Sequence, residues 1–293
     1  MLPNCNENAI NSHIIQRSQF LMPIANASNE LYFIDSKNTF PGKLPKFKRE
    51  PISSILTFQG FCTKHDQMIF SEIEKSSFDL TDRKHLLLFN YRAICHELRK
   101  KWDIISWMEA LIRDDDFPNI PDERFNVSLG GHKLGAKDLE YYKLKAEEEL
   151  VKGISNYDYL VEVLPYREFV TSAIFNIETL TPNEVAKVNT PNWKEEPLKA
   201  MVFTIFPKNA ELILILCYLK SDASIISDFI REMGGINLNF VNKIIIEWIE
   251  TWACSEGFYT TNIQSNRDEI IKACFQSNSI YAANQNELIN IMK

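Results

Sequence analysis

The residues of this chain that are best suited to chemistry are cysteines and histidines near its N-terminus. Cys62 and His65 form a Cys-x-x-His pair ahead of a helical-looking segment, and Cys5 and His13 form a wider pair upstream. Zinc takes four nitrogen or sulfur ligands at the corners of a tetrahedron, and a gap of two residues lets both members of a pair reach one ion. The sequence therefore predicts that the two regions meet at a structural zinc ion. The gap between Cys5 and His13 is too wide for a zinc knuckle, and the fourth ligand is left open.

These residues stand in a recognisable order. Cys5 and the segment Ala9–Gln16, followed by a strand and then by Phe61–Asp66, resemble a degenerate treble-clef module of the His-Me finger kind, the HNH-like nucleases. In that family a cysteine pair precedes a strand that bears the catalytic histidine, and a second pair opens a helix that carries another metal ligand. The resemblance covers roughly the first quarter of the chain. It implies zinc ligands at Cys5, Cys62 and His65, a general base at His13 and a further metal ligand at Asp66.

The sequence departs from the family pattern in two places. No second cysteine lies near Cys5, and the asparagine expected shortly before the second pair is absent from Ile52–Gln59. In addition, His13 cannot serve both as a zinc ligand and as a base. Two interpretations therefore stay open. One is a metal-dependent nuclease-like protein of the kind used in bacterial defence or mobile-element conflict; the other is a non-catalytic, zinc-stabilised scaffold that binds a partner protein through its C-terminal domain.

The nuclease interpretation gives each residue a definite role. His13 would take a proton from a water aimed at a phosphodiester of DNA or RNA, and Asp66 would hold a divalent ion such as magnesium. The segment Phe40–Arg49 is basic and would grip the phosphate backbone. Its basic residues are Lys43, Lys46, Lys48 and Arg49. The alternative for this segment is a solvated loop.

Other candidate sites have more ordinary explanations. His85 and His96 are about three turns apart on one predicted helix, too far to share a metal, and His96 is expected at the surface. The glycines of Gly130–Gly135 predict a flexible turn between two helices, because no strand precedes them as in a phosphate-binding loop. Trp248 and Trp252 lie four apart and predict the buried face of an amphipathic helix, or an anchor for a partner protein if they are exposed.

Composition limits the function classes further. The 293 residues are 45% hydrophobic and 24% charged, which is typical of a globular protein. The formal net charge of −7 excludes a global positive field that would recruit nucleic acid or an anionic membrane. The six cysteines are scattered, no apolar run is long enough to span a membrane, and the first residues lack a signal-peptide core. We therefore expect a cytoplasmic protein with reduced thiols.

The order of expected elements predicts an α+β fold in three parts. These are a small zinc-finger-like module (residues 1–75), a long helical hairpin (76–155) and a C-terminal domain with an antiparallel sheet and helices (156–293). The expected strands are Leu31–Ile34, Tyr159–Leu164, Phe169–Ile177, Ala200–Phe206 and Glu211–Leu219, the last two forming a hairpin. The expected helices are Gln67–Glu74, a long one from Thr81 to about Asp114, Ala136–Lys152, Ser224–Met233, Asn237–Cys254 and Arg267–Gln276.

Overall fold

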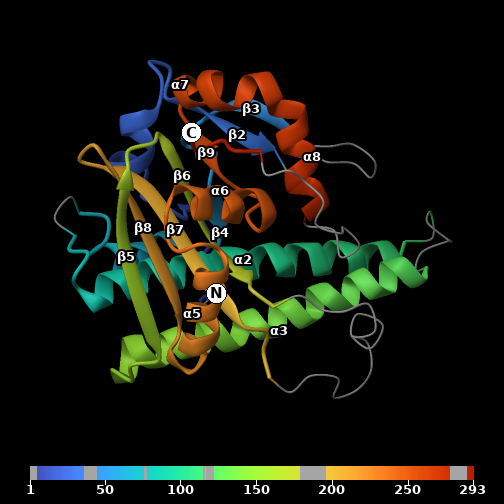
Figure 1. Ribbon diagram of the computed structural model, residues 1–293. Helices are drawn as coiled ribbons and strands as arrows, with labels where there is room; N and C mark the ends of the chain where they lie inside the picture. The colour runs from blue at the N-terminus through green and yellow to red at the C-terminus, as the bar shows by residue number, and fades with distance from the viewer. Residues whose placement is uncertain are drawn as a thin grey trace.

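The computed structural model describes residues 5–35, 45–75, 78–114, 116, 122–178, 196–277 and 289–293. It is built on a seven-stranded antiparallel sheet with the order β3-β2-β9-β6-β7-β8-β5, and a small pair, β1-β4, lies beside it (Figure 1). The strands are β1 Asn11–His13, β2 Glu30–Asp35, β3 Lys46–Pro51, β4 Thr57–Gln59, β5 Tyr157–Pro165, β6 Phe169–Asn176, β7 Ala200–Lys208, β8 Glu211–Leu219 and β9 Ala253–Cys254. The α-helices are α1 Thr63–Phe70, α2 Arg83–Ile112, α3 Glu123–Lys152, α5 Ala223–Glu232, α6 Leu238–Glu247, α7 Glu256–Phe258 and α8 Arg267–Ser277. The predicted α+β class is confirmed.

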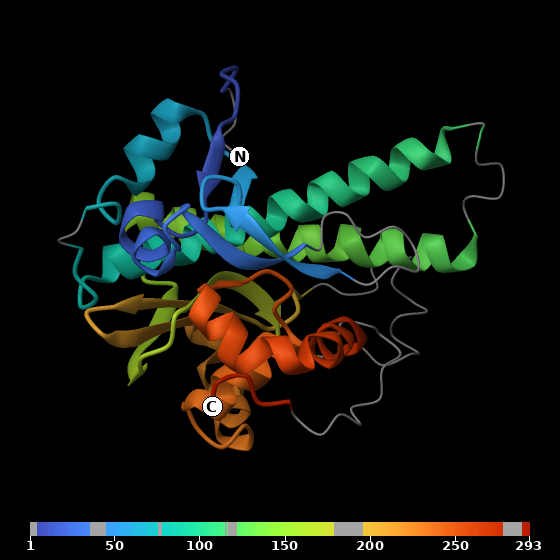
Figure 2. The same cartoon turned by 90° about the horizontal axis from the view of Figure 1, so that it is seen from above.

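The central strands are buried on both faces, and their side chains alternate between two cores. Val202 and Phe206 of β7 belong to a core shared with α2 and α3, whereas Met201 and Phe203 belong to a core shared with α5, α6 and α8. This alternation follows from the two-residue period of a strand. Figure 2 shows the result: the helical hairpin and the small β1–β4 pair lie on one side of the sheet, and the C-terminal helices lie on the other.

The β7–β8 hairpin matches its prediction. Lys208 pairs with Glu211, so that Asn209 and Ala210 form a two-residue loop. Both loop residues have positive φ angles, 52° and 60°. Two such residues in succession define the type I′ turn, whose twist suits a tight antiparallel hairpin.

Three helix predictions were wrong at their ends. The helix predicted over Gln67–Glu74 is α1 and runs from Thr63 to Phe70. α3 begins at Glu123 rather than near Ala136, so the glycines of Gly130–Gly135 lie inside a helix and not in a turn. Asp122 starts this helix, since its side chain accepts a hydrogen bond from the backbone N–H of Phe125 (2.7 Å). A glycine within a helix costs about 1 kcal/mol relative to alanine, and packing of α3 along α2 offsets that cost.

The predicted helix Asn237–Cys254 ends early. α6 stops at Glu247, and Ala253 and Cys254 instead form β9, which joins β2 to β6. Burial of Trp252 accounts for this change, because its indole is fully buried between the rings of Phe47 (5.2 Å) and Phe169 (5.1 Å). The strand β9 therefore connects the N-terminal strands to the C-terminal ones.

Two of the three predicted parts share the seven-stranded sheet, and all three contribute to one apolar core. β2 and β3 of residues 1–75 lie in the same sheet as β5–β9 of residues 156–293. The ring of Phe206 lies 4.1 Å from Phe20 and 5.6 Å from Phe89, which come from the other two parts. The division into three domains stays a prediction. In the described residues, no helix combines the length and the apolar character that crossing a membrane requires.

We expect Phe206→Ala to lower the free energy of unfolding by about 3–5 kcal/mol, because it leaves a cavity among buried rings. Urea denaturation followed by fluorescence measures the change. Val163→Ala is the matched control, since Val163 lies in the same sheet but is 55% exposed; it should stay within about 0.5 kcal/mol of the parent chain. Equal effects of the two substitutions would mean that the contacts of Phe206 with Phe20 and Phe89 do not stabilise the packing of the three parts.

Candidate metal centre

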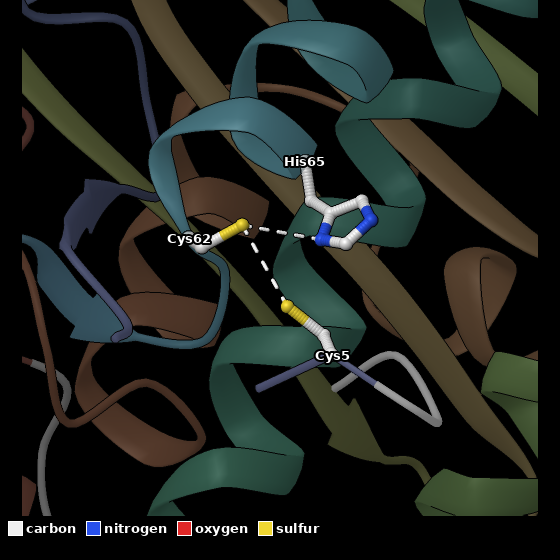
Figure 3. Close-up of side chains that lie close together, drawn as sticks. All are labelled: Cys5, Cys62 and His65. Atoms are coloured by element: carbon white, nitrogen blue, oxygen red, sulfur yellow. Dashed lines mark hydrogen bonds between the residues drawn. The ribbon is translucent and has the colours of Figure 1, made fainter. Parts of the chain in front are cut away.

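Cys5, Cys62 and His65 lie together in space although Cys5 is far away in the sequence (Figure 3). The two sulfurs are 3.7 Å apart, and Cys62 Sγ is 3.2 Å from His65 Nδ1. All three ligand atoms lie within 4.8 Å of one another. Zn–S bonds of about 2.3 Å and Zn–N bonds of about 2.0 Å in a tetrahedron place two sulfurs about 3.8 Å apart and a sulfur about 3.5 Å from a nitrogen. The group could therefore bind a metal ion.

Two local features position Cys62 and His65. Cys62 is the N-cap residue of α1, and its extended backbone (φ −79°, ψ 164°) turns the chain into the helix. The carbonyl of Cys62 accepts the first hydrogen bond of the helix, from the N–H of Asp66 (2.9 Å). His65 lies in that first turn, so its ring returns toward the sulfur. The N-terminus of a helix favours negatively charged groups, which suits thiolate ligands.

Strand pairing brings Cys5 to the same place. β1 runs antiparallel to β4, with Asn11 opposite Gln59. The N–H of Ile10 extends this ladder by donating to the carbonyl of Phe61 (2.8 Å). The segment before β1 therefore passes beside the start of α1. This ladder is the physical means by which the two regions that the sequence predicts to meet come together.

The other four cysteines do not join the group. Cys95, Cys217, Cys254 and Cys274 are at most 6% exposed and belong to the two apolar cores. Burial raises the pKa of Cys95 and of Cys274 to about 12 each. These thiols stay protonated and act as small apolar side chains.

His13 lies at the end of β1 and outside the metal group. Its Nε2 is 2.7 Å from the carbonyl oxygen of Ile52. A carbonyl only accepts hydrogen bonds, so Nε2 carries the proton and Nδ1 is the basic nitrogen. Burial lowers the pKa of His13 below its ordinary 6.5; Arg17 and Arg92 lower it further, while the bond to Ile52 and the charge of Asp66 raise it. His13 is therefore neutral at pH 7.

Of the two charged residues that act on His13 besides Arg17, Arg92 was missed in the sequence, whereas Asp66 was an expected metal ligand. The side chain of Arg92 is 1% exposed, forms an ion pair with Glu74 (2.7 Å) and lies over the ring of Phe70 (4.0 Å). Asp66 is 9% exposed, and one of its carboxylate oxygens is buried without a hydrogen-bond partner. The only signal in the sequence was a charged residue, Arg92, within the apolar run of the α2 helix.

The predicted basic loop is partly a strand. Lys46, Lys48 and Arg49 belong to β3 at one edge of the sheet, and their side chains are exposed, whereas Lys43 lies outside the described residues. Lysines and prolines on an edge strand prevent it from pairing with other chains. Arg49 donates hydrogen bonds to Glu256 and to the hydroxyl of Tyr32. The strand ends next to Ile52, the residue that holds His13.

Three remaining candidates have structural roles and lie outside the metal group. His96 is 4% exposed and lies edge-on to Phe58 (5.5 Å), so the expected surface position was wrong. The small aromatic ring is accommodated in the core because Phe58 offers it an apolar neighbour. Trp252 is fully buried, and Trp248 packs against the same core, so this pair is not an exposed anchor. His85 lies elsewhere, with Nδ1 accepting from the N–H of Asp79 (2.9 Å).

Comparison with the models of known protein families, with curated protein sequences and with solved protein structures finds no match.

We expect two histidines to titrate below their ordinary pKa of 6.5. Burial lowers the pKa of His13, and burial together with Lys101 lowers that of His132 to about 4. The unfolded chain binds these protons near pH 6.5 and the folded chain does not, so stability falls as the pH drops below 6.5. Proton NMR of the imidazole signals measures the midpoints, and His132→Gln should flatten the loss of stability between pH 6.5 and 4. Midpoints at or above 6.5 for both residues would contradict the assigned burial.

Proposed function

We propose that this chain is a zinc-binding protein in which Cys5, Cys62 and His65 are the ligands. The observation that carries this proposal is the spacing of the three ligand atoms, because 3.7 Å between the sulfurs and 3.2 Å from sulfur to nitrogen are close to the edges of a zinc tetrahedron. Two thiolates and an imidazole are a donor set that favours zinc over magnesium or calcium, which prefer oxygen.

Zinc at this position would stabilise the N-terminal segment. No side chain of residues 5–13 belongs to either apolar core. This segment is held mainly by the backbone pairing of β1 with β4. An ion held by Cys5 on one side and by α1 on the other closes a loop of more than fifty residues. Closing a long loop lowers the entropy of the unfolded chain, so metal binding adds directly to the stability of this part of the fold.

We expect about one zinc per chain in the purified protein, and Cys5→Ser or His65→Ala should reduce it to near zero. Elemental analysis after gel filtration measures the content. Cys274→Ser and His85→Ala are the matched controls, because they remove the same side chains outside the metal group and should keep the metal. If the parent chain holds no zinc under reducing conditions, or if the controls lose as much as the ligand variants, the three residues do not form the site.

A second function, hydrolysis of a phosphodiester, is favoured by the state of His13. Its pKa is lowered, so the ring is neutral at pH 7, and its Nε2–H is held by the carbonyl of Ile52. Nδ1 is then the atom that can take a proton from a water molecule. A general base must be unprotonated and oriented by a second group, and His13 meets both conditions.

Asp66 and strand β3 would supply the other parts of this reaction. Asp66 is close enough to raise the pKa of His13, and its unpartnered oxygen is available to a cation. A divalent ion held there, such as magnesium, would stabilise negative charge on the departing oxygen. Lys46 and Lys48 are exposed on the strand that leads to Ile52, where they would contact the phosphates of DNA or RNA.

We expect His13→Ala to lower Mg²⁺- or Mn²⁺-dependent cleavage of DNA or RNA by about 10²–10⁴-fold, because the base that activates water is lost. Gel assays with labelled single- and double-stranded substrates measure the rate, and His85→Ala is the control. Zinc content should stay at the parent level in both variants. If His13→Ala instead releases zinc and unfolds the N-terminal segment, the histidine is structural. The chain is then better described as a zinc-stabilised scaffold that binds a partner protein.

A further inference from the structure

The metal group has three protein ligands where zinc needs four. Among the described residues, no other cysteine, histidine or carboxylate lies within the group formed by Cys5, Cys62 and His65. The chain has six cysteines and five histidines, and every one of them lies in the described ranges. The undescribed residues before Cys5 are Met1, Leu2, Pro3 and Asn4, none of which carries a thiol or an imidazole.

The remaining thiols and imidazoles of the chain are engaged elsewhere. The four other cysteines are buried in the two cores. His13 bonds to Ile52, His85 to Asp79, and His96 lies against Phe58. The fifth histidine, His132, lies in α3 and has charged neighbours from α2. None of these thiols and imidazoles is therefore placed to serve as the fourth ligand of the ion.

Two of the three residues in the group are also partly accessible to solvent. Cys62 is 5% exposed, but Cys5 and His65 are only partly buried. A small molecule could approach the ion past these two side chains. Structural zinc sites are closed by four protein ligands, whereas sites with three protein ligands keep the fourth position for water or substrate.

Resting on the proposed binding of zinc, we infer that the fourth coordination position is open and holds an exchangeable water, which a small anion displaces. The ion is then more than a structural tie between Cys5 and α1. It is a Lewis-acidic centre at which a water or an anionic oxygen, nitrogen or sulfur donor binds directly.

Cobalt in place of zinc tests this inference on the full chain, because the visible bands of tetrahedral Co²⁺ report its ligands. We expect one equivalent of Co²⁺ to bind to the metal-free protein and give thiolate-to-cobalt charge-transfer bands. Added sodium azide should shift the visible bands in a saturable manner while cobalt stays bound, as checked by metal analysis after gel filtration. Bands that azide leaves unchanged would mean that a fourth protein group closes the site, and the inference would be wrong.

A substitution that supplies a fourth thiolate provides the second measurement. Asn8→Cys creates a Cys-x-x-Cys pair with Cys5 at an exposed position, and this spacing lets both sulfurs reach one ion. Its charge-transfer absorbance should rise about 1.5-fold, from two thiolates to three, and the response to azide should disappear. Ser28→Cys, which adds a thiol at an exposed turn outside the metal group, should leave both unchanged.

The outcomes distinguish failure of the open coordination position from failure of the proposed zinc binding on which it rests. If the parent chain binds neither zinc nor cobalt, the zinc proposal fails and the open position fails with it. If the metal binds and azide has no effect, zinc binding stands and only the open position is wrong. If Asn8→Cys still responds to azide as the parent does, the exchangeable ligand is not at the fourth position of this ion, and the inference is again wrong.

Discussion

Burial of both faces of the central sheet is the constraint on which the rest of the structure depends. Each of the strands β6, β7 and β8 carries apolar side chains in both directions, so two separate layers must cover them. The hairpin α2–α3 and the N-terminal segment cover one face, and α5, α6 and α8 cover the other. An antiparallel sheet can leave one face to water, but a sheet with this pattern cannot. The first quarter of the chain is therefore held against α2 and the sheet rather than standing alone.

The metal group is a consequence of that packing and of one short ladder. Cys62 and His65 are brought together by the first turn of α1, which is a local event. Cys5 reaches them only because β1 pairs with β4 and Ile10 continues the ladder to Phe61. Because residues 5–13 contribute no side chain to either core, an ion bound as proposed would stabilise the position of Cys5. The proposed metal binding and the folding of the N-terminal segment would then be a single equilibrium.

Charged groups beneath α1 indicate that more than stability shaped this region. A guanidinium that is 1% exposed, such as that of Arg92, is costly to bury, and its pairing with Glu74 and its contact with Phe70 only offset that cost. Asp66 adds a buried carboxylate with one unpartnered oxygen. Such arrangements perturb the titration of their neighbours, as they do for His13, and are enriched at functional sites. The hydrolytic role proposed for His13 and the open position inferred for the metal use different atoms of this one region.

The sequence by itself determined what local rules control. Strand and helix periods gave β2, β5–β8, α2, α5 and α8 close to their observed places, and the Cys-x-x-His spacing placed Cys62 and His65 on one turn. It failed where distant contacts override local preference: the glycines of α3 lie in a helix because α2 packs along it, and the helix after Asn237 ends early because Trp252 is needed in the core. The family resemblance implied Cys5 as a ligand and His13 as a separate base, but only the tertiary structure decided that the β1–β4 ladder carries Cys5 to this turn and that His13 bonds to Ile52. The reason is that a side chain's partners across a sheet depend on strand register, which the linear order of residues does not encode.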